Sequence, residues 1–339
     1  MKEHRPDQHT VLGAIALANR APSVHNTQPW RWLIGEESIH LMADQTRRVP
    51  ATDPDGRDLL LSCGAALHHL RVALGALGWR AIVHRLPNPG DPDHLAAVEF
   101  APKTPSTEDI TLVGAISRRR TDRRRFTSWP VPDGHLDLMV RRAGKAGALL
   151  VPVTDGLTRR QLTRALDQAA GAQYDDAAYT AELATWSGRN RLARDGVLAA
   201  STPPQARVHG DTAMREFPQG TQPEARTGRN EADGGELLVL ATLADDVVSV
   251  LRAGEAASVA LLTATSIGLA TCLLSQALEL PGTRALVRGP VLDGAAYPHL
   301  ILRTGWAPTA APPPPESRRR ATEDTVDYLP GTHRPAHTP

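Results

Sequence analysis

Cysteine is scarce in this chain, with only Cys63 and Cys272 in 339 residues, so a disulfide scaffold is excluded and at most one bridge could form. The opening stretch, MKEHRPDQHT, is charged and lacks the apolar core of a signal peptide. We therefore predict a reduced, cytoplasmic protein. Both cysteines lie in apolar surroundings, which predicts buried thiols and argues against a reactive nucleophile.

Excess charge and long apolar runs are lacking as well. Lysine and arginine number 38 and aspartate and glutamate 37, so the formal charge of +1 gives no reason to expect nucleic acid or an anionic membrane as a partner. The longest apolar stretches, around 236–244 and 256–264, fall short of the ~20 residues that cross a bilayer. Acidic metal clusters are absent, and the adjacent His68 and His69 would diverge by about 100 degrees on a helix, so we predict no metal site.

Two segments carry strong helical patterns. Residues 57–78 form an amphipathic helix whose apolar positions recur every three or four residues, and Gly78 stands where a left-handed residue would end it. Residues 252–270 are apolar on most sides, which predicts a second, buried helix.

The two predicted helices align with each other. Gly64, Ala66 and Gly78 correspond to Gly254, Ala256 and Gly268 at an offset of 190 (254−64, 256−66, 268−78). Each helix is followed by a predicted strand with a similar exit, at 94–102 and 299–308. We infer an internal duplication, in which two copies act as the fused protomers of a homodimer.

Two regions lack a clear periodic pattern. Residues from about 186 to 235 are polar, rich in Gly and Pro, and too long for an ordinary connection, so they are either a lid or a disordered segment. APPPP at 311–315 predicts a polyproline spacer leading to a tail, in which the paired acids of 322–327 would be solvated.

A run of arginines stands at 118–125, where the stretch ISRRRTDRRRF holds six arginines in eight positions. It could be a solvated basic turn or a nucleic-acid patch, but the latter would need charge spread over a face together with aromatic residues. A phosphate site fits better, because guanidinium forks match phosphate oxygens and the Thr121 hydroxyl can donate to a third oxygen.

The stretch APSVHNTQPW, at 21–30, places Ser23, Asn26 and Gln28 between two prolines. It could be a stiff, capped turn leading into a strand at WRWLI. It could also be a rigid loop whose backbone and amides line a planar ligand such as a flavin, which needs donors and acceptors in one plane.

At these residues the chain resembles the flavin-dependent nitroreductase superfamily and, within it, the Acg-type branch of fused pseudo-dimers. The matching motifs are APSVHNTQPW, RRRTDRR at 118–124, GLATCLLSQALE at 268–279 and LRTGWAP at 302–308. The resemblance implies an α+β fold of two fused half-domains with antiparallel sheets and long central helices. We place the halves at 1–108 and 109–339, the second carrying the insertion at about 186–235 and the C-terminal tail.

The resemblance also implies a single FMN site built from both halves. The first half has the Pro-Ser loop but no arginine motif, and the second has the arginines but reads RRAGKAGALLVPV, 141–153, in place of the loop. The implied FMN-binding residues are Pro22, Ser23, Val24, Asn26, Gln28, Arg119, Arg120, Thr121, Ser275, Gln276, Arg318 and Arg319, with Arg320 as a further candidate. Ser275 and Gln276 correspond to positions near flavin N5, and His25 would contact the substrate.

By the same resemblance the protein is an FMN-dependent oxidoreductase that passes hydride from NAD(P)H to a nitroaromatic, quinone or similar small-molecule acceptor. It would act as a monomer that is an internal pseudo-dimer. The flavin would be the reactive centre, and no side chain would be catalytic. The absence of a GxGxxG motif after a strand does not count against this, since nicotinamide stacks on the flavin in this superfamily. The alternative is a protein that sequesters FMN under a lid without turnover.

Overall fold

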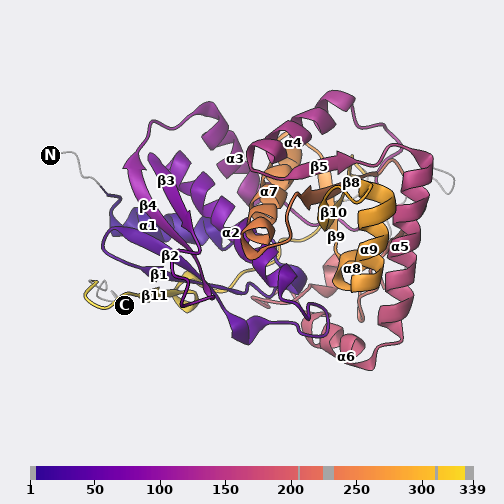
Figure 1. Ribbon diagram of the computed structural model, residues 1–339, viewed down its shortest axis with the longest axis horizontal. Helices are drawn as coiled ribbons and strands as arrows, with labels where there is room; N and C mark the ends of the chain where they lie inside the picture. Colours follow the sequence, from indigo (N-terminus) through magenta and orange to yellow (C-terminus); the bar gives the residue numbers. More distant parts are fainter. Residues whose placement is uncertain (1–4, 205–206, 224–232, 310–311, 333–339) are drawn as a thin grey trace.

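The computed structural model describes residues 5–204, 207–223, 233–309 and 312–332, and its two main sheets lie on either side of a central helix pair (Figure 1). The helices are α1 (Gln8–Ala18), α2 (Arg57–Ala76), α3 (Thr107–Arg118), α4 (Asp133–Lys145), α5 (Gly156–Tyr174), α6 (Ala177–Trp186), α7 (Val247–Ser266), α8 (Gln276–Glu279) and α9 (Pro281–Leu292). The strands are β1 (Trp30–Ile34), β2 (Ser38–Ala43), β3 (Trp79–Arg85), β4 (His94–Pro102), β5 (Leu149–Pro152), β6 (Arg207–His209), β7 (Thr212–Met214), β8 (Glu236–Thr242), β9 (Ala270–Leu274), β10 (Tyr297–Gly305) and β11 (Val326–Tyr328).

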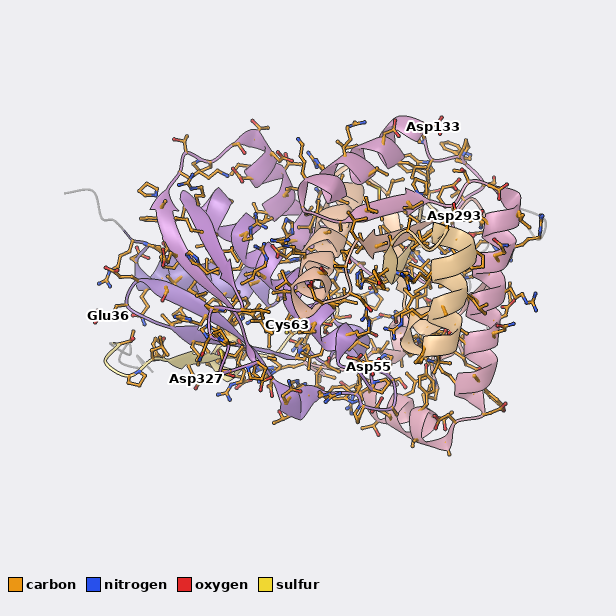
Figure 2. The ribbon with its side chains drawn as sticks, in the orientation of Figure 1. Glu36, Asp55, Cys63, Asp133, Asp293 and Asp327 are labelled. Atoms are coloured by element: carbon orange, nitrogen blue, oxygen red, sulfur yellow. The ribbon has the colours of Figure 1, made fainter. Side chains whose placement is uncertain are left out.

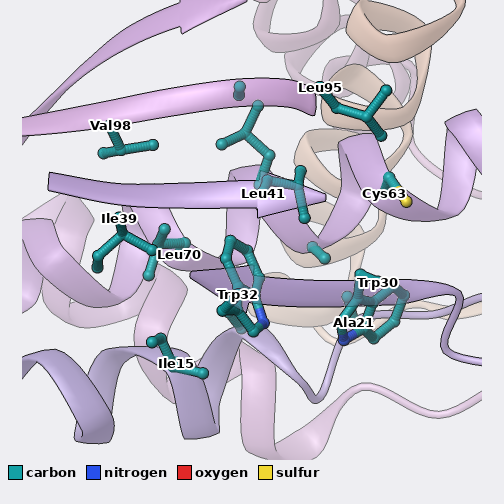
Figure 3. Close-up of a cluster of buried hydrophobic side chains, with 14 of the residues drawn as sticks. Ile15, Ala21, Trp30, Trp32, Ile39, Leu41, Cys63, Leu70, Leu95 and Val98 are labelled. Atoms are coloured by element: carbon teal, nitrogen blue, oxygen red, sulfur yellow. The ribbon is translucent and has the colours of Figure 1, made fainter. Parts of the chain in front are cut away.

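The first sheet has the order β11-β1-β2-β4-β3, antiparallel except for the parallel pair of β1 with β11. Its inner face packs on α1 and α2, and Figure 3 shows Trp30 and Trp32 of β1 within this core. The Nε1 groups of both tryptophans donate to Oδ1 of Asn19, at 2.9 and 3.0 Å. Asn19, at the end of α1, thus satisfies two indole donors that would otherwise be buried without a partner.

The second sheet is antiparallel throughout, in the order β5-β8-β10-β9. One apolar cluster joins it to α4 and α7, and another joins it to α5, α8 and α9. Because both faces are covered, β8 reads as the apolar run LLVLA and does not alternate. The predicted α+β fold with antiparallel sheets and long central helices is therefore confirmed.

Helices α2 and α7 cross at two glycines, and their contacts are reciprocal. A Cβ added to Gly64 would meet the carbonyl oxygen of Leu251, and one added to Gly254 would meet that of Leu61. Both pairs differ by the offset of 190 found in the sequence (254−64, 251−61), and so does the hydrogen-bonded pair of His68 Nδ1 and Ser258 Oγ, 2.8 Å apart. Matched residues that contact each other across an axis are the signature of an isologous, two-fold interface.

The helix predicted at 252–270 lies about one turn earlier in the chain, as α7. Asp246 caps α7, its carboxylate accepting from the backbone N–H of Ser249, so the helix begins at Val247. It ends at Ser266, because Gly268 takes the left-handed conformation at φ +89° and β9 starts at Ala270. Gly78 ends α2 in the same way, at φ +90°, as its sequence predicted.

The C-terminal segment is not the solvated tail that we predicted, although its acids Glu323 and Asp324 are exposed as expected. Residues 312–328 return to the first half of the chain, where β11 pairs with β1 and Thr325 is fully buried. Asn19 Nδ2 donates to Thr325 Oγ1 at 2.8 Å, which fixes this return. The described parts of the insertion at 186–235 include the two-stranded β6-β7 sheet, and β7 packs against α5. Residues 205–206 and 224–232 of the insertion lie outside the described residues. The boundary placed at 108/109 falls in the first turn of α3.

Two helices reach the length and hydropathy of a membrane span, contrary to the sequence argument from apolar runs. They are α2 and α7, each 20 residues long, and most of each is buried inside the protein against the other and the two sheets. Burial of this kind is what a core helix shows, so their hydropathy is accounted for by packing. The two cysteines are buried and unpaired, as predicted, and Cys63 lies near the middle of the molecule (Figure 2).

Replacement of Gly64 by Ala tests the helix crossing. The added methyl would come within 2.9 Å of Gly254 Cα, so we expect Gly64→Ala to lower the free energy of unfolding by about 1–3 kcal/mol, measured by denaturant unfolding. Gly114→Ala is the matched control, because Gly114 is exposed within α3 and has no atom near the added Cβ. In that control the free energy of unfolding should rise by up to about 1 kcal/mol, because alanine has a higher helix propensity than glycine. Equal effects in the two variants would contradict the tight crossing.

Candidate functional site

The loop between α1 and β1 is held in an unusual backbone conformation. His25, Asn26 and Gln28 have φ of 46°, 57° and 53°, values that side chains other than glycine rarely adopt. Two serines hold it there: Ser23 Oγ accepts from the N–H of Gln28 at 2.9 Å, and Ser62 Oγ of α2 accepts from the N–H of Val24 at 3.1 Å. Such strain persists only where the surroundings impose it, so the loop is rigid and pinned to α2.

The side-chain amides of this loop bind protein through both of their nitrogens and through Gln28 Oε1, whereas the buried Asn26 Oδ1 has no hydrogen-bond partner among the described residues. Gln28 is fully buried, its Nε2 donating to the carbonyl of Arg194 at 2.8 Å while its Oε1 accepts from the N–H of Arg320 at 2.8 Å. Asn26 Nδ2 donates to the carbonyl of Gly196 at 3.1 Å. The polar capacity of the loop therefore goes largely into joining the insertion and the C-terminal segment to the first half.

An arginine-rich cavity lies beside this loop, and we call it the arginine cavity. The volume open to the centres of water molecules is about 80 Å³. Its lining comes from both halves: Arg20, Pro22, Ser23, His25, Asn26, Ile116, Arg119, Arg120, Thr121, Arg123, Gly196, Val197, Ser201, Pro315, Glu316, Ser317 and Arg319. Five of these are arginines, whereas Glu316 is the single carboxylate in the lining. The site therefore carries a positive charge that its own residues do not neutralise.

Arg119 and Arg319 carry the clearest mark of this excess charge. Burial, reinforced by Arg120 and Arg20, lowers the pKa of Arg119 to about 10, and burial with Arg119 and Arg20 lowers that of Arg319 to about 9. Both guanidinium groups stay protonated at neutral pH, and within the described residues the Nε of buried Arg119 has no hydrogen-bond partner. Arg319 donates to the uncharged carbonyl oxygens of Arg20, Ala21, Ser317 and Arg318. Crowded guanidinium groups without a carboxylate partner favour a multiply charged anion.

Three further arginines near these two are held by carboxylates. Arg20 and Arg120 both bind Glu316, at 2.5 and 3.1 Å. Arg124 forms a buried ion pair with Asp122 at 2.6 Å. Arg318 lines neither this cavity nor the one described next, although its carbonyl accepts from Asn26 Nδ2 at 3.4 Å.

The further candidate Arg320 is turned away as well. Its guanidinium group binds the carbonyl oxygen of Asp324, 2.6 Å away, and so braces the end of the chain.

A second, more apolar cavity adjoins the first, and we call it the apolar cavity. Its volume open to water centres is about 110 Å³. The residues that line it are Pro22, Ser23, Val24, His25, Asp58, Leu61, Ser62, Ala65, Thr121, Arg123, Arg215, Phe217, Ala257, Leu273, Ser275 and Leu300. The two cavities share five residues, Pro22, Ser23, His25, Thr121 and Arg123, and so form neighbouring parts of one elongated site.

Arg215 closes one side of the apolar cavity from within the insertion. It donates to Tyr179 Oη at 2.9 Å and to Ser275 Oγ at 3.0 Å, and it forms a buried ion pair with Glu279. Phe217, two residues on, stacks under the Arg123 guanidinium group, 4.7 Å from its ring centroid. This part of the insertion is therefore an ordered cover over the cavity, which favours the lid over the disordered alternative.

Two predicted residues beside this cover differ in orientation. Ser275 lines the apolar cavity, but Gln276 does not, because its side chain donates to Gln173 Oε1 at 2.9 Å on the far side of α8. His25 lines both cavities and is buried, and burial followed by the charges of Arg215 and Arg123 lowers its pKa well below the usual range. His25 is therefore a neutral hydrogen-bonding group at physiological pH.

Sequence reasoning missed several lining residues, chiefly Arg20, Asp58, Arg215, Phe217 and Glu316. Asp58 had a readable signal, since it lies on the same face of α2 as Leu61, Ser62 and Ala65 at helical spacing. A carboxyl group on the buried face of a helix costs free energy, so it indicates either a hydrogen-bonding partner or a functional role. Arg215 had no signal, because nothing in an irregular insertion indicates which side chain turns inward.

The arrangement brings together the two stretches singled out in the sequence, the Pro-Ser loop and the arginine run. One end presents unpaired positive charge, and the other presents apolar side chains with a few hydrogen-bonding groups at the rim. A ligand with an anionic end and a flat, largely apolar end matches this pattern.

Comparison with known proteins gives relatives that span nearly the whole chain. It is 44% identical over 331 residues to the Mycobacterium tuberculosis protein Rv3131, provisionally named an NAD(P)H nitroreductase, covering 97% of this chain and 94% of that one. It is 37% identical over 325 residues to Acg of the same organism, which carries the same provisional name, covering 96% and 97%. No family model matches the chain.

Solved structures with a related arrangement include two nitroreductases. One is the FMN-dependent NfnB of Mycobacterium smegmatis in complex with NADPH, at 16% identity and a TM-score of 0.41, covering 65% of this chain and 98% of that one. The other is an FMN-bound nitroreductase of Bacteroides fragilis, at 13% and 0.39, covering 67% and 98%. Both TM-scores lie below 0.5, so these likenesses are weak.

The unneutralised charge of the arginine cavity predicts stabilisation by phosphate. Inorganic phosphate at ten times its dissociation constant should add about 1.4 kcal/mol to the free energy of unfolding, seen as a rise in the thermal midpoint over chloride at equal ionic strength. Glu316→Gln removes the cavity's carboxylate, so this phosphate effect should grow in that variant. Identical midpoints in phosphate and chloride would contradict an anion site.

Proposed function

The chain belongs to the NAD(P)H nitroreductase family that includes Rv3131 and Acg, and on that premise we propose that it is an FMN-dependent oxidoreductase. It takes hydride from NAD(P)H and passes electrons to a nitroaromatic, a quinone or a similar acceptor. FMN, when bound, supplies the two-electron chemistry, and the protein binds it, orients it and excludes water.

The observation that carries this proposal is the pair of adjoining cavities. A phosphate dianion would offset the crowded charge of Arg119 and Arg319, which lowers the pKa of both, and could accept from the Nε of Arg119, which has no partner among the described residues. The apolar cavity next to it has aliphatic walls and a rim of serine, threonine and histidine groups, which suits a flat heterocycle. The chemistry of the donor set therefore fits FMN.

The proposed binding residues divide into three roles. Arg119, Arg319 and Thr121 hold the phosphate, with Arg20 and Arg120 supporting them through Glu316. The ring lies against Pro22, Ser23, Val24 and Ser275, and His25 faces the substrate. Asn26 lines the arginine cavity, with its Nδ2 bound to the carbonyl of Gly196 and its Oδ1 without a partner among the described residues. Gln28, Gln276 and Arg318 support the site indirectly, because their side chains bind protein groups or lie outside both cavities.

We further propose that the halves 1–108 and 109–339 are two fused nitroreductase-like protomers, so that a monomer acts as its own dimer with one FMN. The reciprocal contacts of Gly64 and Gly254 at the central crossing support this. So does the split lining of the arginine cavity, in which the loop comes from one half and the arginines from the other. Size-exclusion chromatography with light scattering tests the monomer.

A second function, sequestration of FMN without turnover, is favoured by the cover over the apolar cavity. Arg215 and Phe217 line the apolar cavity from within the insertion, and the buried ion pair of Arg215 with Glu279 holds Arg215 there. If this cover does not open, bound FMN is protected from hydride donors. The oxidoreductase proposal therefore requires that the insertion move during turnover.

Arg119→Ala tests the phosphate assignment. Loss of charge-assisted hydrogen bonds worth roughly 1.5–3 kcal/mol should raise the dissociation constant for FMN by about one to two powers of ten, measured by flavin fluorescence titration. Arg118→Ala is the control, because Arg118 belongs to the same run but is exposed and lines neither cavity. An unchanged dissociation constant in Arg119→Ala would refute the placement.

Reduction by a nicotinamide separates the two functions. We expect purified protein to be yellow and NADPH, added without oxygen, to bleach its flavin absorbance, because hydride transfer reduces the bound ring. Yellow protein that NADPH does not bleach would leave sequestration as the function. A colourless protein that binds no added FMN would defeat both.

A further inference from the structure

Asp58 is a buried carboxyl group that no part of the proposed mechanism uses. It stands in the first turn of α2, is 9% exposed, and its Oδ2 has no hydrogen-bond partner among the residues the structure describes. Capping of α2 is done by another residue, since Asp53 Oδ2 accepts from the N–H of Leu59 at 2.9 Å. The structure of the helix end therefore does not explain why an acid is buried at position 58.

The position of Asp58 connects two cavities. It lines the apolar cavity, and it also lines a small acidic cavity together with Asp53, Pro54, Asp55, Arg57, Leu278, Glu279 and His299. The volume of the acidic cavity open to water centres is about 10 Å³, which is room for roughly one water molecule. At its outer side Asp55, labelled in Figure 2, has a side chain that is 58% exposed. Carboxyl groups thus run from the surface to the wall of the apolar cavity.

Burial and the neighbouring carboxyl groups favour the protonated form of Asp58. Burial raises its pKa well above the usual range, and Asp53 and Glu279 raise it further, whereas Arg215 and Arg57 act in the opposite sense. Burial also raises the pKa of Asp53, and it lowers that of His299 to about 4, so His299 adds no positive charge at neutral pH. Glu279 stays paired with Arg215. Removing Arg215 from the cavity when the insertion moves would favour the protonated acid still more.

Other titratable groups on the wall of the apolar cavity are poor proton donors. The pKa of His25 is too low for it to hold a proton at neutral pH, and the arginines Arg123 and Arg215 do not release theirs. Within the described lining, Asp58 is thus the carboxyl group, and its raised pKa favours a form that carries a proton to donate. A donor buried beneath a cover matters because bulk water reaches such a site poorly.

We propose that Asp58 is the proton donor to an electron acceptor that enters beside the ring when the insertion moves, and that the acidic cavity returns a proton to Asp58 from solvent. This inference rests on the proposed oxidoreductase function. A quinone that accepts a hydride becomes a monoanion, the O–H bond of Asp58 breaks, and the proton forms the new O–H bond of the neutral hydroquinone. The Asp58 carboxylate then regains a proton by way of Asp53 and the water-sized space beside it.

The protonation of Asp58 is tested first in the protein without flavin. Infrared difference spectra between low and high pH should show a protonated carboxyl band that persists above neutral pH and disappears in Asp58→Asn. The variant should also lose a pH dependence of stability. Because the folded protein keeps the Asp58 proton while the unfolded chain releases it above about pH 4, the unfolding equilibrium constant rises up to about tenfold per pH unit in the wild type, and Asn removes one proton of that slope.

Activity gives the second test, with p-benzoquinone as acceptor and NADPH as donor. Asp58→Asn should bind FMN within about twofold of wild type and still be bleached by NADPH, but quinone reduction should slow by about 10²–10⁴-fold and lose its decline at high pH. Asp58→Glu keeps an acid and should recover part of the rate with its pH dependence. Asp55→Asn, at an exposed position outside the apolar cavity, should leave the infrared band unchanged.

The outcomes separate the inference from the function on which it rests. Persistence of the band in Asp58→Asn, or an unchanged quinone rate and pH profile in that variant, would overturn the role of Asp58 while leaving the oxidoreductase intact. Failure of the wild type to bind FMN or to be reduced by NADPH would instead overturn the proposed function, whatever the infrared spectra show.

Discussion

The close crossing of α2 and α7 at Gly64 and Gly254 is the contact on which the rest of the structure depends. A methyl group at either glycine would collide with the backbone of the other helix, so the distance between the two halves is set by the absence of two side chains. The apolar cavity lies along the same helices, with Leu61 and Ala65 on one and Ala257 on the other. Its width is therefore fixed by the packing of the core, and each half contributes one wall.

The charge of the site follows from how the halves are joined. Loop residues that precede β1 and arginines that follow α3 meet because these two elements flank the central pair, α3 packing on both α2 and α7. Once there, the arginines are buried among one another, and the fold tolerates them at a cost in free energy. Unfavourable burial of this kind is typical of a binding site, since a bound anion offsets the repulsion.

The sequence predicted the architecture well where local chemistry and periodicity agree. The left-handed glycine that ends α2, the strand at 94–102, the duplication and the buried thiols could all be read from single patterns. The sequence-based prediction failed where the same residue type suits two different structural roles. Gln28 was expected to line a ligand but is buried against backbone groups. The C-terminal segment was expected to be a solvated tail, but although its acids Glu323 and Asp324 are exposed, Thr325 anchors the segment to Asn19. Arg215 could not be found at all, because its position depends on the path of an irregular insertion.

The return of residues 312–328 over the arginine cavity has a consequence for biosynthesis. Pro315, Glu316, Ser317 and Arg319 complete the cavity wall, and β11 anchors them by pairing with β1, which is made some 290 residues earlier. During translation the first half can fold while this wall is still inside the ribosome or not yet made. The nascent chain thus carries its arginines uncovered until residues 312–328 emerge, and a phosphorylated ligand can be enclosed only after that segment has been made.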